Sequence, residues 1–566
     1  MQTREIIEQD LNKHKLERKL EIGILIDKFT VPSWEYEVVR EINASEHSHI
    51  ALVIMPGDKI IAEGMKSGKG NFVFRMHNYI DHFVFLGKHN YSERKDIGEL
   101  VKEVPKIHIS PPRRGGSEQS GQAIISEFGK FNLDIIIKVG YGPVNADLLS
   151  LPRYGLLSYS MTDSVSEESD TTGYFEVIDK SPVTVSELLI TRGGGQKRIV
   201  INRVVESTCS YSISLNRDKL FRRASLFIPR VIDGLWIHGP DYLDRLESIY
   251  GSYDIYVNKP APPFSRSVFN LFKGSLIFFR QLIKKLIYTD PFTWILLYKT
   301  GTQDDFTRNS YKDFAELKPP KDRFWADPFL TGRGGKFYLF AEEFIYRSNK
   351  GHISVLELDS TGQLLKIQKI IDKPYHMSYP FIFECDNNFY MIPETGGNRS
   401  IDLYKCTGFP WKWEFRKSIM KNVNAVDSTL FYYNGKWWLF TVIDKIDSDL
   451  AVSPELYLFY SDDFLSDNWT GHLMNPVVTD VRTARPAGKI FLQEGKIYRP
   501  SQDCSGRYGN SFDINQIITL SESAYEEENI LKIKPEWKRD LKGTHTFNYE
   551  SGLTIIDVYK FRRRFL

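Results

Sequence analysis

Five segments in the second half of the chain place a polar residue directly before a short apolar run. Each apolar run is followed by a turn rich in Gly, Asn or Asp and then by a second strand-like run. The second run ends 15 positions after the leading residue in the first three copies and 17 positions after it in the fourth. The leading residues are Asp327, Tyr379, Asp427, Arg485 and His545, and the polar residues that end the second runs are Glu342, Glu394 and Gln502.

These residue types are suited to acid–base chemistry on a polar substrate. A carboxylate such as Asp327 or Asp427 can take a proton from a hydroxyl group, and the planar guanidinium of Arg485 can hold a phosphate or a uronate. His545 can donate a hydrogen bond or act as a second base. We predict catalytic roles for Asp327, Asp427 and Glu394 and expect no metal. The predicted substrate-binding residues are Glu342, Tyr379, Arg485, Gln502, Asp503 and His545.

Such chemistry requires that the five leading residues meet in space. The hairpins begin 48 to 60 residues apart, with further short apolar runs between them, and this period is typical of an all-β five-bladed β-propeller. The first strand of each blade lies next to the propeller axis, so the leading residues are expected to converge there. The alternative is that they only hydrate a central channel. Several carboxylates argue against it, because like charges raise one another's pKa and cost stability.

The first half of the chain alternates short apolar runs with polar helical stretches. Residues 21–27, 49–56 and 133–140 are rich in Ile and Val, as strands buried on both faces are. This alternation predicts an α/β domain of the Rossmann type, with a parallel sheet covered by helices on both faces. Ligands of such domains bind at the carboxyl ends of the strands.

We predict four parts along the chain: a polar N-terminal helix over 1–20, the α/β domain over 21–235, a linker over 236–300 and the propeller over 301–566. Residues 260–289 of the linker contain five basic residues and no acidic residue. Two interpretations of a helix here remain open: it packs between the domains, or residues 265–288 and the basic C-terminus contact an anionic membrane surface.

Composition excludes several classes of protein. The formal net charge of +2 over 566 residues gives no general attraction to nucleic acid. The four cysteines have no metal-binding spacing, and their scatter fits a reducing compartment. The polar N-terminus lacks the apolar core of a secretion signal, and no run approaches the roughly 20 residues of a membrane span. We therefore expect a cytoplasmic protein, with peripheral contact at the inner membrane as the further possibility.

The segments "LDIIIKVGYG" and "ADLLSLPRYGLLSYSMTD" resemble the formyltransferase family. The resemblance implies a catalytic Asn and His on the second segment, where this chain has Ser158 and Ser160, and a later Asp, where it has only Glu187. A tetrahydrofolate donor is therefore not expected. The nearby "TRGGGQKR", residues 191–198, reads as a basic hairpin rather than as a phosphate-binding loop.

The blade starts resemble those of five-bladed glycosidases of the arabinanase and xylosidase type. That resemblance implies a general base at Asp327 and a pKa modulator at Asp427. Its general acid corresponds to Arg485, which cannot donate a proton near neutral pH, so Glu394 or Glu342 must replace it if the chain is a hydrolase.

The longer pattern "FWADPFL", "YLFAEEF", "SYPFIFE", "YMIPET" and "YRPSQDCS" resembles the N-terminal region of the plant glucosamine inositolphosphorylceramide transferase family. The resemblance implies glycan or glycolipid assembly. We predict a carbohydrate-active transferase of bacterial surface polysaccharide or glycolipid synthesis, with a saccharide at the propeller axis and a nucleotide sugar or other phosphorylated donor on the α/β domain. The alternatives are a non-catalytic glycan-binding scaffold, a glycoside hydrolase and a sugar N-formyltransferase.

Overall fold

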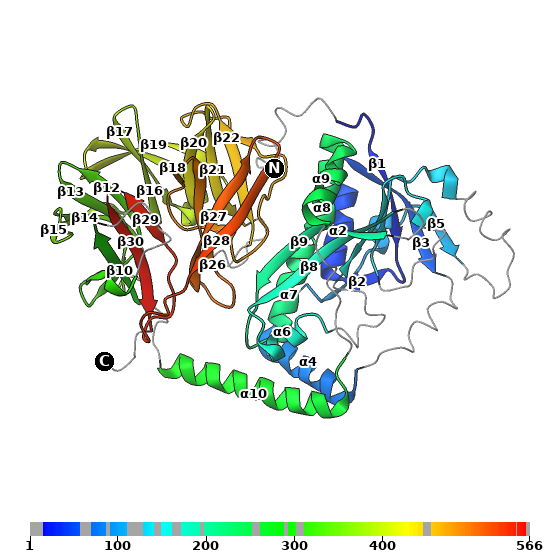
Figure 1. Ribbon diagram of the computed structural model, residues 1–566. Helices are drawn as coiled ribbons and strands as arrows, with labels where there is room; N and C mark the ends of the chain where they lie inside the picture. Colours follow the sequence, from blue (N-terminus) through cyan, green and yellow to red (C-terminus); the bar gives the residue numbers. More distant parts are fainter. Residues whose placement is uncertain are drawn as a thin grey trace. The chain divides into compact units, whose positions relative to one another are not determined.

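The chain forms two compact units, one of Leu11–Gln281 and one that includes Leu282–Leu566 (Figure 1). The computed structural model describes residues 15–56, 70–86, 91–109, 128–140, 149–160, 171–192, 197–251, 261–287, 293–301, 311–444, 454–550 and 552–561.

The first unit is built on a seven-stranded sheet. Its five strands from β5 to β7 are parallel to their neighbours, whereas β8 and β9 are antiparallel. The predicted parallel sheet is therefore a mixed one, because the chain returns as a hairpin after β7. The pairing of β8 with β9 confirms the basic hairpin. In spatial order the strands are β5 (Lys106–Ile109), β3 (Ser48–Pro56), β1 (Leu20–Leu25), β6 (Ile135–Lys138), β7 (Gly155–Tyr159), β8 (Val183–Arg192) and β9 (Lys197–Ser207).

Helices α2 (Ser33–Ala44), α7 (Ile213–Ala224) and α8 (Phe227–His238) pack together beside this sheet. The Trp34 ring of α2 stacks on Phe221 of α7 at 5.3 Å and meets Tyr159 of β7 edge-on at 4.8 Å. Burial of such aromatic rings stabilises the unit by about 1.5–3 kcal/mol each.

The predicted boundary between α/β domain and linker, at residue 235, is wrong because it falls inside α8. Helix α9 (Asp241–Tyr250) also belongs to this unit, since it packs on β9 and its Glu247 pairs with Arg192 of β8 at 2.7 Å. The N-terminal helix predicted over residues 1–20 lies mostly outside the described residues, and residues 15–19 are not helical.

Three more helices complete the described part of this unit: α4 (Phe72–Phe85), α6 (Tyr174–Asp179) and α10 (Phe264–Ile287), whose last turns continue past Gln281. Asn71 caps α4, accepting from Phe74 N at 3.1 Å, and its amide donates to Ser267 Oγ of α10 at 2.8 Å. The start of α10 is thereby fixed to α4. Within the described residues, no helix has the length and apolar character needed to cross a membrane.

The second unit consists of five antiparallel sheets of four main strands each, as predicted for a five-bladed propeller. Every hairpin predicted from the sequence forms the two inner strands of one blade. The first blade consists of β12 (Arg323–Arg333), β13 (Lys336–Ile345), β14 (Lys350–Leu358) and β15 (Leu364–Ile371). The second consists of β16 (Ser378–Cys385), β17 (Asn388–Glu394), β18 (Ser400–Gly408) and β19 (Lys412–Lys421). The third consists of β20 (Ala425–Tyr433), β21 (Lys436–Ile443), β22 (Leu456–Ser461) and β23 (Thr470–Gly471).

The fourth blade has β24 (Arg485–Pro486), β26 (Lys496–Asp503), β27 (Ser511–Leu520) and β28 (Tyr525–Ile533), with β25 (Phe491–Gln493) paired to β26.

The fifth blade is assembled from both ends of the propeller. Its strands β29 (Phe547–Glu550) and β30 (Leu553–Lys560) are completed by β10 (Thr293–Thr300) and β11 (Ala315–Leu317). The propeller therefore begins before the predicted residue 301.

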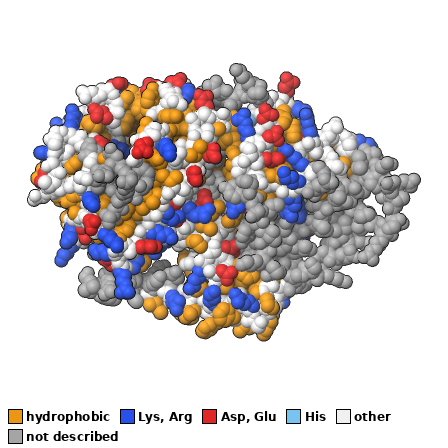
Figure 2. Space-filling view, in the orientation of Figure 1, with side chains coloured by type: hydrophobic (Ala, Val, Ile, Leu, Met, Phe, Trp, Pro, Cys, Tyr) orange, Lys and Arg blue, Asp and Glu red, His pale blue; other side chains and the backbone are white. Residues whose placement is uncertain are grey.

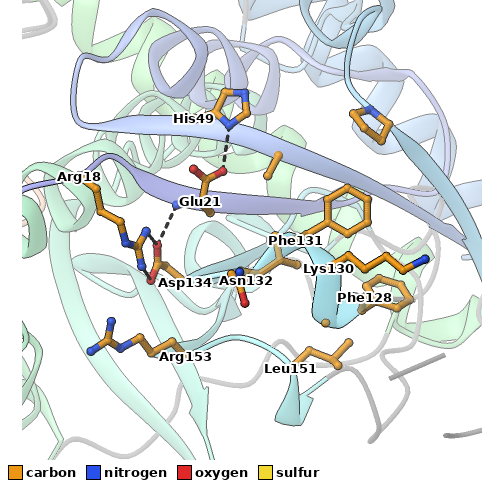
Figure 3. Close-up of a pocket in the computed structure, with 14 residues that line it drawn as sticks. Arg18, Glu21, His49, Phe128, Lys130, Phe131, Asn132, Asp134, Leu151 and Arg153 are labelled. Atoms are coloured by element: carbon orange, nitrogen blue, oxygen red, sulfur yellow. Dashed lines mark hydrogen bonds and ion pairs between the residues drawn. The ribbon is translucent and has the colours of Figure 1, made fainter. Parts of the chain in front are cut away.

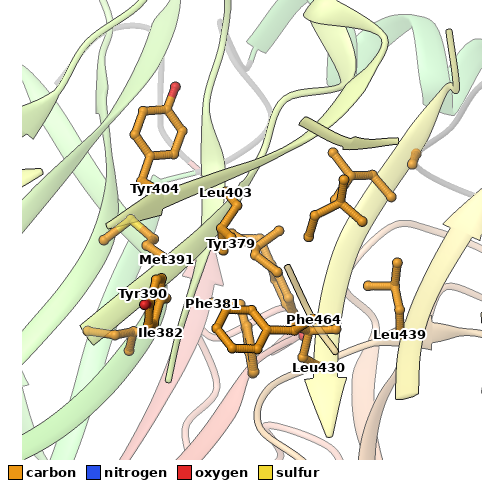
Figure 4. Close-up of a cluster of buried hydrophobic side chains, with 14 of the residues drawn as sticks. Tyr379, Phe381, Ile382, Tyr390, Met391, Leu403, Tyr404, Leu430, Leu439 and Phe464 are labelled. Carbon is orange, nitrogen blue, oxygen red and sulfur yellow. The ribbon is translucent and has the colours of Figure 1, made fainter. Parts of the chain in front are cut away.

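Aromatic and branched side chains fill the spaces between blades. Figure 4 shows this core between the second and third blades, where Phe381, Tyr390, Leu430 and Leu439 lie close together. The Phe329 ring of the first blade meets Tyr379 of the second edge-on at 4.8 Å. This packing explains the high aromatic content of the chain, 14%, and holds the inner strands in position.

Candidate functional site

Three of the five leading residues occupy the same unusual backbone conformation. Asp327, Tyr379 and Asp427 have φ of 50°, 43° and 51°, in the left-handed region. Each lies where the pairing of the first strand with the second shifts register, so each is part of a β-bulge. A non-glycine residue with positive φ is uncommon and costs roughly 1–3 kcal/mol, and such strain gathers at functional sites. The bulge turns these three residues out of the regular alternation of the strand.

A buried ion pair joins the third and fourth blades. Arg485 Nε donates to Asp427 Oδ2 at 2.5 Å, and Gln502 Nε2 donates to the same oxygen at 2.9 Å. Arg485 Nη2 lies 3.7 Å from Glu394 Oε2 of the second blade, and its guanidinium lies 5.0 Å from the Tyr508 ring centroid. The cation therefore pairs with Asp427 and also lies near the Glu394 carboxyl group of another blade.

Asp557 of β30 organises the contact between the fifth and first blades. Its carboxylate accepts from the backbone N–H of Asp327 at 3.0 Å and of His545 at 3.0 Å, and from the Thr546 hydroxyl at 2.5 Å. His545 Nδ1 lies 2.7 Å from Asp557 Oδ2, and His545 Nε2 lies 3.6 Å from Asp327 Oδ1. The imidazole stacks on Trp294 with centroids 3.7 Å apart.

Burial and neighbouring charges raise the pKa values of three carboxyl groups in this cluster. Burial raises the pKa of Asp327 to about 6, with His545 opposing and the charges of Asp427 and Asp557 adding to the rise. Burial also raises the pKa of Glu342 and of Glu394 well above the usual range, and neighbouring carboxylates raise both further. The site therefore places Asp327, a candidate base, beside two glutamic acids with a raised pKa, which are candidate acids.

For His545 and Asp557, the close partners together affect the pKa more than burial does. Burial alone would lower the pKa of His545, but the charges of Asp557 and Asp327 leave it raised. Burial alone would raise the pKa of Asp557, but His545 and the hydrogen bonds from Thr546 leave it lowered. The imidazolium and the Asp557 carboxylate thus form a stable pair that positions Asp327.

One side of this cluster is more accessible than the other. The side chain of Glu394 is 15% exposed and that of His376 is 44% exposed, against 2% for Asp427. His376 Nε2 lies 3.5 Å from Glu342 Oε1. Glu394 and His376 are therefore the parts of this cluster that face solvent most.

The structure brings Asp327, Asp427, Glu394, Glu342, Arg485, Gln502 and His545 into one connected cluster. The side chains of two other predicted binding residues are used elsewhere, although the backbone N–H of Tyr379 donates to Asp327 Oδ2 at 3.2 Å. Tyr379 is completely buried, and its hydroxyl is used by Thr429 Oγ1 and by Gly488 N, both at 2.9 Å, so it fills the space between blades. The carboxylate of Asp503 instead pairs with Lys532 at 2.8 Å, because residues 502 and 503 point to opposite faces of β26.

Four residues of the site escaped the sequence analysis: Asp557, Tyr508, Trp294 and His376. Asp557 had a signal, since it occupies in the fifth hairpin the position that corresponds to Glu342 and Gln502. Trp294 had none, because it lies on β10, far from the fifth hairpin in sequence. Among the described residues, Asp327, His545 and Asp557 each offer one ligand atom within 4.8 Å of the others.

The α/β unit carries a cavity of about 880 Å³ at the amino ends of its strands, shown in Figure 3. Arg18 binds Asp134 through two hydrogen bonds of 2.6 and 2.8 Å, and His49 Nδ1 lies 2.9 Å from Glu21 Oε2. Phe128, Phe131, Leu151 and Arg153 add to its wall. The sequence had predicted a ligand at the opposite edge of the sheet.

At that opposite edge, the ends of β3, β6 and β7 lead into residues outside the described ranges. Ser158 and Ser160 of the formyltransferase resemblance are both buried. Glu187 is also buried and pairs with Arg203 at 2.9 Å. These side chains form no described acid–base group.

Glu35, in the first turn of α2, is the most perturbed acid at this edge. Burial raises its pKa to about 8, while the charges of Arg94, Lys138 and Lys28 oppose the rise. Its Oε2 atom has no hydrogen-bond partner. This group lies beside β1 and β6, where the strand order of the sheet reverses, which is the usual ligand position in such folds.

Glu35→Gln is expected to stabilise the α/β unit at high pH. A carboxyl whose pKa is higher in the folded state than in the unfolded state loses stability as pH rises from about 4.5 to about 8. The variant should therefore match the parent protein near pH 4.5 and exceed its melting temperature by roughly 5 °C at pH 9. Calorimetric scans at both pH values measure this, with exposed Glu99→Gln as the control. A difference in melting temperature that is independent of pH would contradict the prediction.

Comparisons with known proteins concern mainly the propeller. Residues 314–560 match the family model described as glucosamine inositolphosphorylceramide transferase 1, N-terminal. The rice protein of that name (Oryza sativa subsp. japonica) is 36% identical over 209 residues, which are 36% of this chain and 27% of the relative. The Arabidopsis thaliana protein is 32% identical over 210 residues, 37% of this chain and 27% of the relative. The match thus spans about a quarter of these relatives.

Among solved structures, the catalytic domain of an α-L-arabinofuranosidase from Coprinopsis cinerea covers 48% of this chain with a TM-score of 0.33 and 10% identity; 98% of that domain is covered. An arabinanase from Bacillus subtilis covers 41% of this chain with a TM-score of 0.30 and 13% identity, and 92% of it is covered.

Proposed function

We propose that this protein is a carbohydrate-active transferase of glycolipid or surface-polysaccharide assembly, and that the saccharide binds at the Glu394 side of the propeller cluster. The observation that carries the proposal is that a candidate base and a candidate acid belong to one buried cluster. Arg485 contacts Asp427 at 2.5 Å and lies 3.7 Å from Glu394, the pKa of Asp327 is about 6, and the pKa of Glu394 is raised well above the usual range. The matched family region, residues 314–560, contains both. From its relatives' name, we take the acceptor class to be an inositol-phosphate lipid.

In this proposal, Asp327 removes the proton of an acceptor hydroxyl and Glu394 donates a hydrogen bond to the sugar. Asp557 and His545 hold Asp327 in place. Arg485 balances the charge of Asp427. We assign a phosphorylated donor, such as a nucleotide sugar, to the edge of the α/β sheet where Lys28, Arg94 and Lys138 influence Glu35.

The test is donor-dependent addition of mass to an acceptor. Full-length protein is incubated with UDP-glucose, UDP-glucuronate or UDP-N-acetylglucosamine and with an inositol-phosphate glycolipid, and the lipids are measured by mass spectrometry. We expect a product with the parent protein and with the control Asp467→Asn, whose side chain is 90% exposed. Absence of any product with every donor, together with retained glycolipid binding, would support a non-catalytic glycan-binding scaffold instead.

A second candidate function, glycoside hydrolysis, is favoured by the same acid and base. Inverting hydrolysis uses one protonated and one ionised carboxyl group, and Glu394, with its raised pKa, and Asp327 are the candidates for these two roles. Release of reducing ends from arabinan or xylan without any donor would support it. We do not extend the proposal to formyl transfer, because Ser158 and Ser160 are buried and supply no base.

A further inference from the structure

Helix α10 presents a wide apolar face to solvent. Phe272 is 70% exposed, and successive positions 100° apart around the helix place the other exposed apolar residues on the same side. The remaining residues of this face are Phe264, Val268, Phe269, Leu276 and Phe279. The opposite side packs against α4: Ser267 and Asn270 are buried, and Phe278 meets Phe85 at 5.7 Å.

Helix α4 exposes a second apolar face. Phe83 is 78% exposed and Tyr79 is 71% exposed, and Phe72, Ile80 and Val84 are exposed beside them. The other side of α4 is fixed to the unit, because buried Asp81 accepts from Ser212 Oγ at 3.0 Å and from Ser214 N at 2.6 Å. Helix α4 therefore has apolar residues on both sides: Val73 and Phe74 are buried next to the polar anchor, and a second apolar set faces outward, where an ordinary surface helix has polar residues.

Charge on this two-helix surface has one sign. Arg266, Lys273 and Arg280 recur at intervals of seven residues, so they form a row along one edge of the apolar face of α10. Residues 264–287 contain no acid, and the single acid of α4, Asp81, is buried. Figure 2 shows hydrophobic side chains together with Lys and Arg side chains at the lower edge of the view, over α10.

We propose that α4 and α10 form a docking surface for an anionic lipid bilayer, with both helices lying in the headgroup region. Exposed aromatic residues on one face and a basic row at its edge are the features of interfacial helices. A soluble protein rarely leaves so many adjacent Phe and Tyr side chains in water. A second copy of this chain would place basic row against basic row, whereas anionic headgroups are complementary to it.

The proposal does not depend on the transferase activity, although it would bring the protein to a lipid-linked acceptor. The experiment is flotation of the full-length protein with vesicles of phosphatidylcholine, with or without 30 mol% phosphatidylglycerol. The first variant, F83E/F272E, removes apolar contacts, and the second, R266Q/K273Q/R280Q, removes the basic row. F415E is the control, because Phe415 of the propeller is 54% exposed and isolated from both helices in sequence.

We expect the parent protein and F415E to float with phosphatidylglycerol vesicles and F83E/F272E to stay in solution. The basic-row variant should lose roughly fivefold in affinity per residue removed, and so about a hundredfold in all, on anionic vesicles only. Unchanged melting temperatures show that the variants are folded. Failure of the parent protein to bind anionic vesicles overturns the proposal. So does binding that none of the changes reduces, or conversion of a parent dimer into a monomer by F83E/F272E, since that would make the surface a protein interface.

Discussion

Replacing Arg485 with leucine is expected to lower the free energy of unfolding of the propeller by about 3–5 kcal/mol. The guanidinium is 8% exposed and lies 2.5 Å from Asp427 and 3.7 Å from Glu394. Its removal leaves the buried Asp427 carboxylate with Gln502 as its remaining donor from the fourth blade. The uncompensated charge, rather than the lost attraction, accounts for most of the cost.

The change is measured as the shift of the propeller transition in calorimetry, because a chain of two units need not unfold in one step. Arg482→Leu is the matched control: Arg482 pairs with Asp480 on the surface, where its side chain is 48% exposed, and such pairs contribute about 0–1 kcal/mol. The double variant D427N/R485L should recover a large part of the loss, because it removes the charge that Arg485 compensates. Equal losses for R485L and R482L would show that Asp427 does not depend on the cation.

The sequence was sufficient to predict the blades, because hairpins are local structures. The pattern around Asp327, Tyr379 and Asp427 repeats within a few residues of each hairpin, and the inner strands form where it predicts. The closure of the fifth blade could not be predicted in this way, since β10 pairs with β30 more than 250 residues later. Neither the sequence around Ile295 nor the sequence around Val558 indicates that these two residues pair.

The site was predicted only in part, because the sequence shows the local repeat but not the long-range packing. The leading position of each blade is fixed by the repeat, and so Asp327, Asp427, Arg485 and His545 were found. Whether the Tyr379 side chain reaches the site or packs between blades depends on the width of the space between the blades, which a sequence repeat does not encode. In this protein the phenol ring of Tyr379 fills that space. The mixed character of the α/β sheet also follows from long-range packing, since β8 and β9 contain Val, Ile and Leu as the parallel strands do, and these residues do not specify strand direction.

Asp327→Asn is expected to reduce turnover by about 10²–10⁴-fold, the usual contribution of a general base. An asparagine cannot take the proton of an acceptor hydroxyl, yet it keeps the size of the side chain and the backbone hydrogen bond to Asp557. The saccharide should therefore still bind, and the loss should appear in kcat. Isothermal titration with the acceptor and steady-state kinetics with the donor separate the two effects. Equal loss of binding and turnover would indicate that Asp327 holds the sugar rather than activating it.

The pH dependence provides an independent test of the same role. Because the pKa of Asp327 is about 6, kcat/KM should rise with pH and level off above that value. Protonated Glu394 should produce a decline at higher pH, since its pKa is raised well above the usual range. Asp427→Asn removes a negative charge that raises the pKa of Asp327, so the acidic limb should move to lower pH, whereas D467N leaves it in place. An acidic limb that is unchanged in the Asp427 variant would assign the titration to a group outside the propeller cluster.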